Sequence, residues 1–143
     1  MAPSFVLDNS VVMTWCFEDE TSDYADAVLE SIASTSALVP AIWPLEVVNV
    51  LWVAEKKKRL EPADTIRFIE LLRSLPIEVV KETTDKRMRD LLGLARSANI
   101  SSYDASYLDL AMRHGLPLAT LDQQLRLAAK EQNVRIFDIE NIV

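Results

Sequence analysis

The most informative stretch of the chain is Phe5-Val6-Leu7-Asp8-Asn9-Ser10-Val11. Its three apolar residues show no polar alternation, which is typical of a short strand that is covered on both faces. Similar apolar runs occur at 37–39, 77–80, 116–119 and 135–137. Longer amphipathic segments separate these runs, so the chain can return to the same edge of one sheet after each strand. The sequence therefore predicts an α/β fold with a parallel five-stranded sheet covered by helices.

Helices are expected at 11–17, 22–34, 44–59, 62–74, 84–98, 102–114 and 122–131. Pro44 and Pro62 fit the first positions of two of them, and His114-Gly115 fits the end of another. No Pro/Gly/Ser-rich linker and no repeat interrupts the 143 residues, a length at the mode for one domain. We therefore expect residues 1–143 to form a single domain.

The charges are unevenly distributed along the chain. It has 22 acidic and 15 basic residues, a net charge of −7, and no Lys or Arg before Lys56. This balance argues against a protein that holds nucleic acid by clustered positive charge alone, although it does not exclude an enzyme that cuts nucleic acid. Candidates for contact with RNA occur only in the later part of the chain: Lys56, Lys57, Lys58, Arg59, Arg67, Arg73, Lys86, Arg87 and Arg89.

The rarest residues exclude several kinds of site. Gly93 and Gly115 are the two glycines, so neither a GxGxxG nor a GxxxxGK[ST] phosphate loop is present. Cys16 and His114 are the single cysteine and histidine, too few for a zinc site or a disulfide framework. Any metal would need oxygen ligands. Because no apolar run approaches about 18 residues and no signal peptide is evident, we expect a cytoplasmic protein without membrane contact.

Four acids are predicted to meet at one edge of the sheet. Asp8 follows the first strand, Asp122 closely follows the fourth, and Glu46 and Asp104 occupy the first turns of two helices. In a parallel α/β layer the carboxyl ends of strands and the starts of helices share one edge, where ligands bind. Each acid could instead serve only its helix terminus. For Asp8 this alternative is weaker, because Ser10 is available to cap a helix that begins at Val11.

Four clustered carboxylates would repel one another by about 3 kcal/mol per pair at 5 Å, so a divalent cation is the expected compensation. Oxygen ligands suit Mg²⁺ or Mn²⁺, which in turn suggests phosphate chemistry with a metal-activated water. Ser10, Asn49 and Thr120 lie close enough in sequence to support the carboxylates. Asp109 and Asp138 are weaker candidates, and Tyr103 and Tyr107 are interpreted as packing residues.

Four segments resemble the acidic blocks of PIN-domain ribonucleases, and of VapC-like toxins from type II toxin–antitoxin pairs in particular. They are the segments around Asp8, Glu46, Asp104 and Asp122, and they occur in family order over nearly the whole chain. The resemblance implies an α/β/α sandwich on a five-stranded parallel sheet and a Mg²⁺- or Mn²⁺-dependent endoribonuclease. It implies that these four acids form the metal site with Ser10 and Thr120 as polar supports, and Asn49 matches a common polar position. It also implies a homodimer, an RNA substrate of the tRNA or rRNA class, and a cognate antitoxin.

Two other functions remain open at this point. A haloacid-dehalogenase-like phosphatase also has an acid after its first strand, but Asp8-Asn9-Ser10 lacks the second acid two residues later. A receiver domain would need a Lys near Asp122, and none is there. The alternative outside enzymes is a module whose acidic pocket binds a basic peptide of a partner.

Overall fold

The computed structural model describes residues 2–82 and 84–138. Its centre is a parallel sheet of four short strands in the order β3-β2-β1-β4. The strands are β1 (Phe5–Leu7), β2 (Ala37–Val39), β3 (Ile77–Val79) and β4 (Leu118–Ala119). All residues of β1, β2 and β4 are buried, whereas the edge strand β3 is partly exposed. Continuous apolar strands are thus found where helices cover the sheet, which confirms the α/β prediction.

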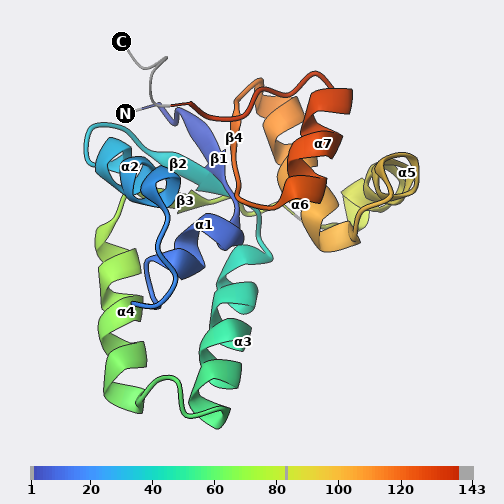
Figure 1. Ribbon diagram of the computed structural model, residues 1–143. Helices are drawn as coiled ribbons and strands as arrows, with labels where there is room; N and C mark the ends of the chain where they lie inside the picture. The colour runs from blue at the N-terminus through green and yellow to red at the C-terminus, as the bar shows by residue number, and fades with distance from the viewer. Residues whose placement is uncertain (1, 83, 139–143) are drawn as a thin grey trace.

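The helices flank the sheet in two groups (Figure 1). They are α1 (Asn9–Thr14), α2 (Asp23–Ile32), α3 (Trp43–Lys56), α4 (Pro62–Ser74), α5 (Met88–Ala98), α6 (Ser102–His114) and α7 (Gln123–Glu131), with a 3-10 turn η1 (Thr84–Arg87) before α5. In one group, α6 contacts β1 and β4, and α5 and α7 pack against α6. In the other group, α1 contacts α2 and α3. α3 and α4 extend beyond the sheet as an antiparallel pair (Figure 1).

The prediction of a fifth strand at 135–137 is wrong. Ile136 forms one parallel bridge with Leu118, and two backbone hydrogen bonds join Leu118 to Arg135 and Phe137. β4 offers only two residues to pair with, and Phe137 instead stacks on Phe5 with its ring centroid 4.0 Å away. The described part of the chain therefore has four strands, with the 135–137 segment beside the edge strand β4.

Several helix boundaries differ from the predicted ones by a few residues. α1 begins at Asn9, two residues earlier than expected, because Asp8 rather than Ser10 is its N-cap. The expected helix at 84–98 is divided into η1 and α5. Other local signals are confirmed: α4 begins at Pro62, and Gly115 ends α6 with a left-handed φ of 64°.

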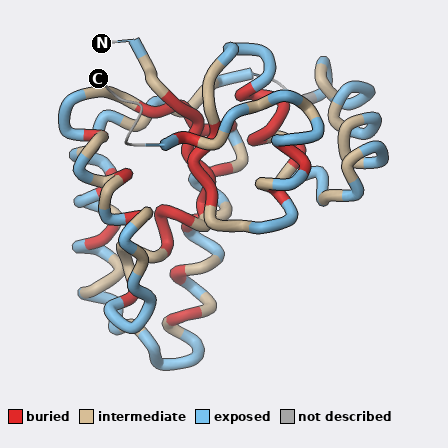
Figure 2. The backbone as a smooth tube through the Cα atoms, turned by 45° about the horizontal axis from the view of Figure 1, so that its top comes forward, coloured by how far each residue is buried: buried red, intermediate tan, exposed pale blue. Residues whose placement is uncertain are grey.

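The buried residues lie in the strands and on the inner faces of α1, α2, α3, α6 and α7 (Figure 2). Phe5, Leu7 and Tyr107 are among the largest side chains that are fully buried. α5 contributes no buried residue and packs on the outside of α6. No helix in the described part of the chain is both long and apolar enough to cross a membrane.

Candidate active site

The topology brings the four predicted acids to one edge of the sheet. Asp8 follows β1 and caps α1, Asp122 caps α7, and Glu46 and Asp104 lie in the first turns of α3 and α6. Figure 1 shows the starts of these four helices gathered at the lower edge of the sheet. The charges of Asp8, Asp122 and Glu46 all raise the pKa of Asp104, so all four carboxylates interact electrostatically.

Asp8 is held in place by a hydrogen-bond network that spans β1, α1 and β4. Its backbone N–H donates to the carbonyl oxygen of Ala119 at 2.9 Å. Its Oδ2 accepts hydrogen bonds from Ser10 Oγ at 2.6 Å and from Thr120 Oγ1 at 2.8 Å. Burial raises the pKa of Asp8, and the hydrogen bonds from Ser10 and Thr120 oppose that rise. The carboxylate thus has a fixed orientation at the end of the central strand.

The same network positions the backbone that leads to Asp122. Ser10 Oγ accepts from the backbone N–H of Leu121 at 3.0 Å, and Thr120 Oγ1 accepts from that of Asp122 at 3.0 Å. Asp122 Oδ1 in turn accepts from the N–H of Leu125 at 3.1 Å, which is its capping bond. The sequence did not indicate a further contact, from Arg126 Nε to the Thr120 carbonyl oxygen at 2.7 Å. Both predicted hydroxyl groups therefore lie between Asp8 and Asp122.

Glu46 has a partner that the sequence interpretation missed. The hydroxyl of Tyr107 donates to Glu46 Oε1 at 2.6 Å. Burial, and after it the hydrogen bond and charge of Glu46, raise the pKa of Tyr107, so the hydroxyl keeps its proton. Burial also raises the pKa of Glu46 itself, while the bond from Tyr107 lowers it and the charge of Asp8 raises it. The available signal was a tyrosine three residues after Asp104, on the same side of a helix.

Tyr103 does not share this environment. Its side chain is 57% exposed, so the interpretation of Tyr103 as a packing residue is wrong, whereas that of Tyr107 is confirmed. Tyr103 lines a groove of about 620 Å³ together with Glu46, Asn49 and Trp52. Asn49 is exposed on α3 one turn after Glu46, and its side chain makes no hydrogen bond to the described residues. The predicted polar support thus lies beside one acid without contacting it.

Asp109 does not join the acidic cluster. It is buried on α6, where Oδ1 accepts from Arg87 at 2.7 Å and Oδ2 accepts from Arg113 Nε at 2.9 Å. Arg113 also contacts Glu82 on the segment before η1. These ion pairs fasten the segment around η1 to α6.

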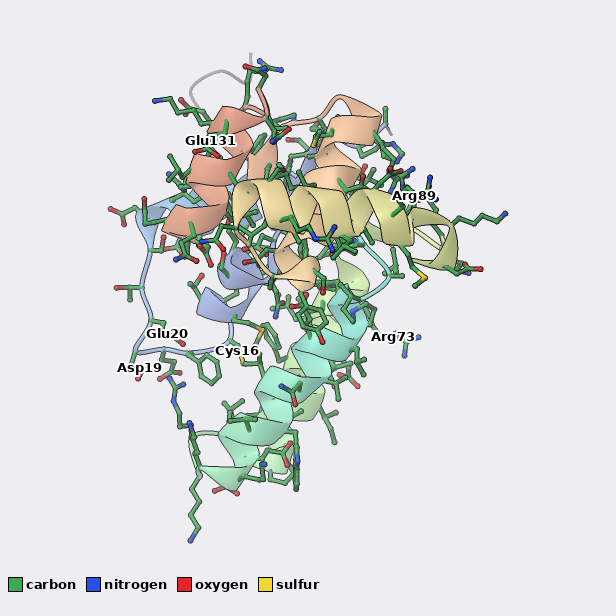
Figure 3. All side chains as sticks on the ribbon, turned by 90° about the vertical axis from the view of Figure 1, so that its right-hand side faces the viewer. Cys16, Asp19, Glu20, Arg73, Arg89 and Glu131 are labelled. Carbon is green, nitrogen blue, oxygen red and sulfur yellow. The ribbon has the colours of Figure 1, made fainter. Side chains whose placement is uncertain are left out.

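Three of the basic residues proposed for RNA contact are already paired. Arg59 contacts Asp19 at 3.1 Å, Arg67 contacts Asp64, and Arg87 contacts Asp109. Figure 3 shows Asp19 and Glu20 on the loop that follows α1, and Arg73 and Arg89 on the outside of the molecule. Lys56 lies at the far end of α3, about 15 Å along the helix from Glu46 at 1.5 Å per residue.

The donor chemistry of the four acids fits a hard cation. Burial first, and then the charges of Asp8, Asp122 and Glu46, raise the pKa of Asp104 from 3.8 to about 6. That repulsion is what a divalent ion would relieve, and carboxylate oxygens are ligands that Mg²⁺ and Mn²⁺ accept. As the side chains stand, no three Asp, Glu, His or Cys residues within 2–82 and 84–138 are close enough together to enclose an ion.

A parallel α/β domain with an acidic cluster at the carboxyl edge of its strands is the class of protein that these observations define. Residues 5–131 match the family model of the PIN domain, and the chain belongs to the PIN-domain family. Among curated proteins it is similar to Ribonuclease VapC3 of Pyrobaculum aerophilum, with 27% identity over 120 residues that cover 84% of this chain and 90% of the relative.

Two solved structures share the fold. PAE2754 from Pyrobaculum aerophilum superposes with a TM-score of 0.72 at 22% identity, covering 99% of this chain and 95% of the other. FitAcB from Neisseria gonorrhoeae gives a TM-score of 0.64 at 19% identity, covering 96% and 99%. These similarities confirm the predicted resemblance to VapC-like PIN domains, and they set aside the alternative phosphatase fold.

Proposed function

We propose that the protein is a Mg²⁺- or Mn²⁺-dependent endoribonuclease that hydrolyses RNA phosphodiester bonds. The main observation behind this proposal is that Asp8, Glu46, Asp104 and Asp122 lie at one edge of the sheet. They are close enough that the charges of the other three raise the pKa of Asp104. Similarity to a protein named as a ribonuclease supports the reaction class. We assign the metal-binding and catalytic roles to these four acids.

The acids of this site differ in how firmly they are held. Asp8 is fixed by Ser10 and Thr120, so its carboxylate needs little reorganisation when a ligand binds. Glu46 and Asp104 belong to α3 and α6 and bring negative charge from two further helices. The bare cluster repels a phosphate, which makes RNA binding at these acids dependent on positive charge. Mg²⁺ or Mn²⁺ held by these carboxylates would supply that charge and would lower the pKa of a water for attack on the phosphodiester.

The test is cleavage of a mixed tRNA and rRNA substrate in Mn²⁺ by the wild type and by Asp8→Asn and Asp104→Asn. Both variants should lose at least about 100-fold in rate, because each removes one carboxylate of a site that acts as a unit. Asp26→Asn is the matched control, since Asp26 is exposed in the first turn of α2. Equal cleavage by the wild type and Asp8→Asn would reject the assignment, as would activity that persists in EDTA.

We also propose that the protein is the toxin of a toxin–antitoxin pair. The resemblance implies a cognate antitoxin, and a cluster of acids is suited to receive a basic side chain of such a partner. We also propose a cytoplasmic location, where such a substrate and such a partner would both be available. The product of an adjacent small reading frame should bind the chain and inhibit cleavage. Cleavage that is unaffected by that product would contradict the toxin role.

A homodimer is the assembly we propose. α3 exposes Leu45, Val48 and Trp52, and α5 exposes Met88 and Leu92. The three α3 side chains line one groove, exposed apolar surface of this kind marks interaction sites, and a second copy of the chain is the partner that the resemblance implies. Sedimentation velocity of the purified protein tests this assembly directly.

A further inference from the structure

We propose that Tyr107 is a positioning residue for the Glu46 carboxylate, an inference that rests on the proposed cation site. The contact joins two helices that bring acids to the site. Tyr107 lies on α6, three residues after Asp104, and its hydroxyl donates to Oε1 of Glu46 on α3 at 2.6 Å. One hydrogen bond thus couples the helix of Asp104 to the side chain of Glu46.

The donor is rigid and the acceptor is not. Tyr107 has 0% of its surface exposed and belongs to the core, so its hydroxyl cannot move without repacking the sheet and α6. Glu46 is only half-buried, and a glutamate has three rotatable side-chain bonds. Within the described chain, the Tyr107 hydroxyl is the one hydrogen-bond donor to its carboxylate. Without that donor, Glu46 would sample orientations that point away from the other acids.

The other acids are held differently. Asp8 is oriented by Ser10 and Thr120, and the carboxylate of Asp122 by the backbone N–H of Leu125. Removing the Tyr107 hydroxyl should therefore disturb Glu46 while it leaves Asp8 and Asp122 in place. The expected defect is weaker cation binding, because partners that orient a metal ligand contribute about 10–100-fold to metal affinity.

The experiment titrates Mn²⁺ alone into the whole protein and follows free Mn²⁺ by electron paramagnetic resonance. Tyr107→Phe keeps the ring in the core and removes one oxygen, and it should weaken Mn²⁺ binding about tenfold. Tyr24→Phe is the matched control, because it also removes one tyrosine hydroxyl, which donates to the Phe137 carbonyl oxygen at 2.7 Å and to none of the four acids. Urea unfolding in EDTA measures how much stability each variant loses, and Tyr24→Phe should retain wild-type Mn²⁺ affinity.

A second arm isolates the contact. In a Glu46→Ala background, Tyr107→Phe should change Mn²⁺ affinity by less than about twofold, because no carboxylate remains to be positioned. In RNA cleavage, excess Mn²⁺ should restore Tyr107→Phe toward the wild-type rate but should not restore Asp8→Asn.

The outcomes separate this inference from the proposed function. Wild-type Mn²⁺ affinity in Tyr107→Phe, or an equal loss in Tyr24→Phe, overturns the positioning role while the ribonuclease assignment stands. The positioning role is also overturned if Tyr107→Phe weakens Mn²⁺ binding as strongly in the Glu46→Ala background as it does in the wild type. Failure of the wild type to bind Mn²⁺ rejects the proposed metal site and this inference together.

Discussion

Asp104→Asn is predicted to stabilise the cation-free protein and to reduce its stabilisation by Mn²⁺. The pKa of Asp104 rises from 3.8 to about 6 on folding, through burial and then through the charges of Asp8, Asp122 and Glu46. A pKa shift of about two units means that the ionised Asp104 destabilises the fold by about 3 kcal/mol at most, at about 1.4 kcal/mol per unit. The side chain is only half-buried, so solvent screening reduces this to about 1.5 kcal/mol.

Asp104→Asn removes this destabilising charge, but it also removes a favourable interaction with the helix. Asp104 lies in the first turn of α6, where a negative charge is favourable by about 0.5 kcal/mol, so the net gain for Asp104→Asn is about 1 kcal/mol at pH 7.5. The sign follows from linkage: a carboxyl with a raised folded-state pKa stabilises the fold below its unfolded pKa, and that contribution is lost as the pH rises through about 6. The gain should therefore shrink as the pH is lowered from 7.5 toward 4.

Urea unfolding in EDTA and in excess Mn²⁺ provides the assay. Mn²⁺ at about 100 times its dissociation constant should stabilise the wild type by about 2.7 kcal/mol and should stabilise Asp104→Asn much less, which reverses their order. Asp26→Asn, an exposed acid in the first turn of α2, should stay within about 0.5 kcal/mol in both buffers. A loss of stability in EDTA for Asp104→Asn, or a gain that does not vary with pH, would refute the reasoning.

Three further substitutions test other parts of the molecule. Asp109→Ala should destabilise the fold in urea more than Asp64→Ala does, because it leaves Arg87 and Arg113 without the buried carboxylate that they share. Asp64→Ala, which breaks the exposed pair with Arg67, should cost under about 1 kcal/mol. Trp52→Glu places a charge on the exposed face of α3 and should convert the proposed dimer to a monomer in sedimentation velocity, with an unchanged circular dichroism spectrum. A dimer that persists would show that this face is not the interface.

The sheet and most helices could be predicted because their signals are local. Buried strands such as Phe5–Leu7 are continuous apolar runs, and Pro62 and Gly115 mark helix ends by their backbone geometry. The prediction of a strand at 135–137 is wrong because a strand needs a partner of matching length, and β4 is only two residues long. Apolar composition alone cannot reveal how many residues a neighbouring strand offers.

The acids could be predicted and their partners could not. Topology places the carboxyl ends of strands together, so Asp8 and Asp122 follow from the order of the elements. The contact between Tyr107 and Glu46 joins residues 61 positions apart and depends on how α6 packs against the rest of the core. The pairing of Arg59 with Asp19 likewise depends on how the α1–α2 loop meets the end of α3. Such contacts arise from packing, which a sequence pattern does not encode locally.

The four acids can stabilise helix N-termini and also form the proposed cation site. Asp8 and Asp122 cap α1 and α7, and Glu46 and Asp104 lie in first turns, so each acid gains about 0.3–1 kcal/mol from a helix N-terminus. These favourable placements allow four carboxylates to share one edge of a folded protein. They do not remove the repulsion, because the pKa of Asp104 is still raised to about 6. That residual repulsion is what the proposed cation would relieve at this edge, while the placement of the acids at helix N-termini favours the fold without the cation.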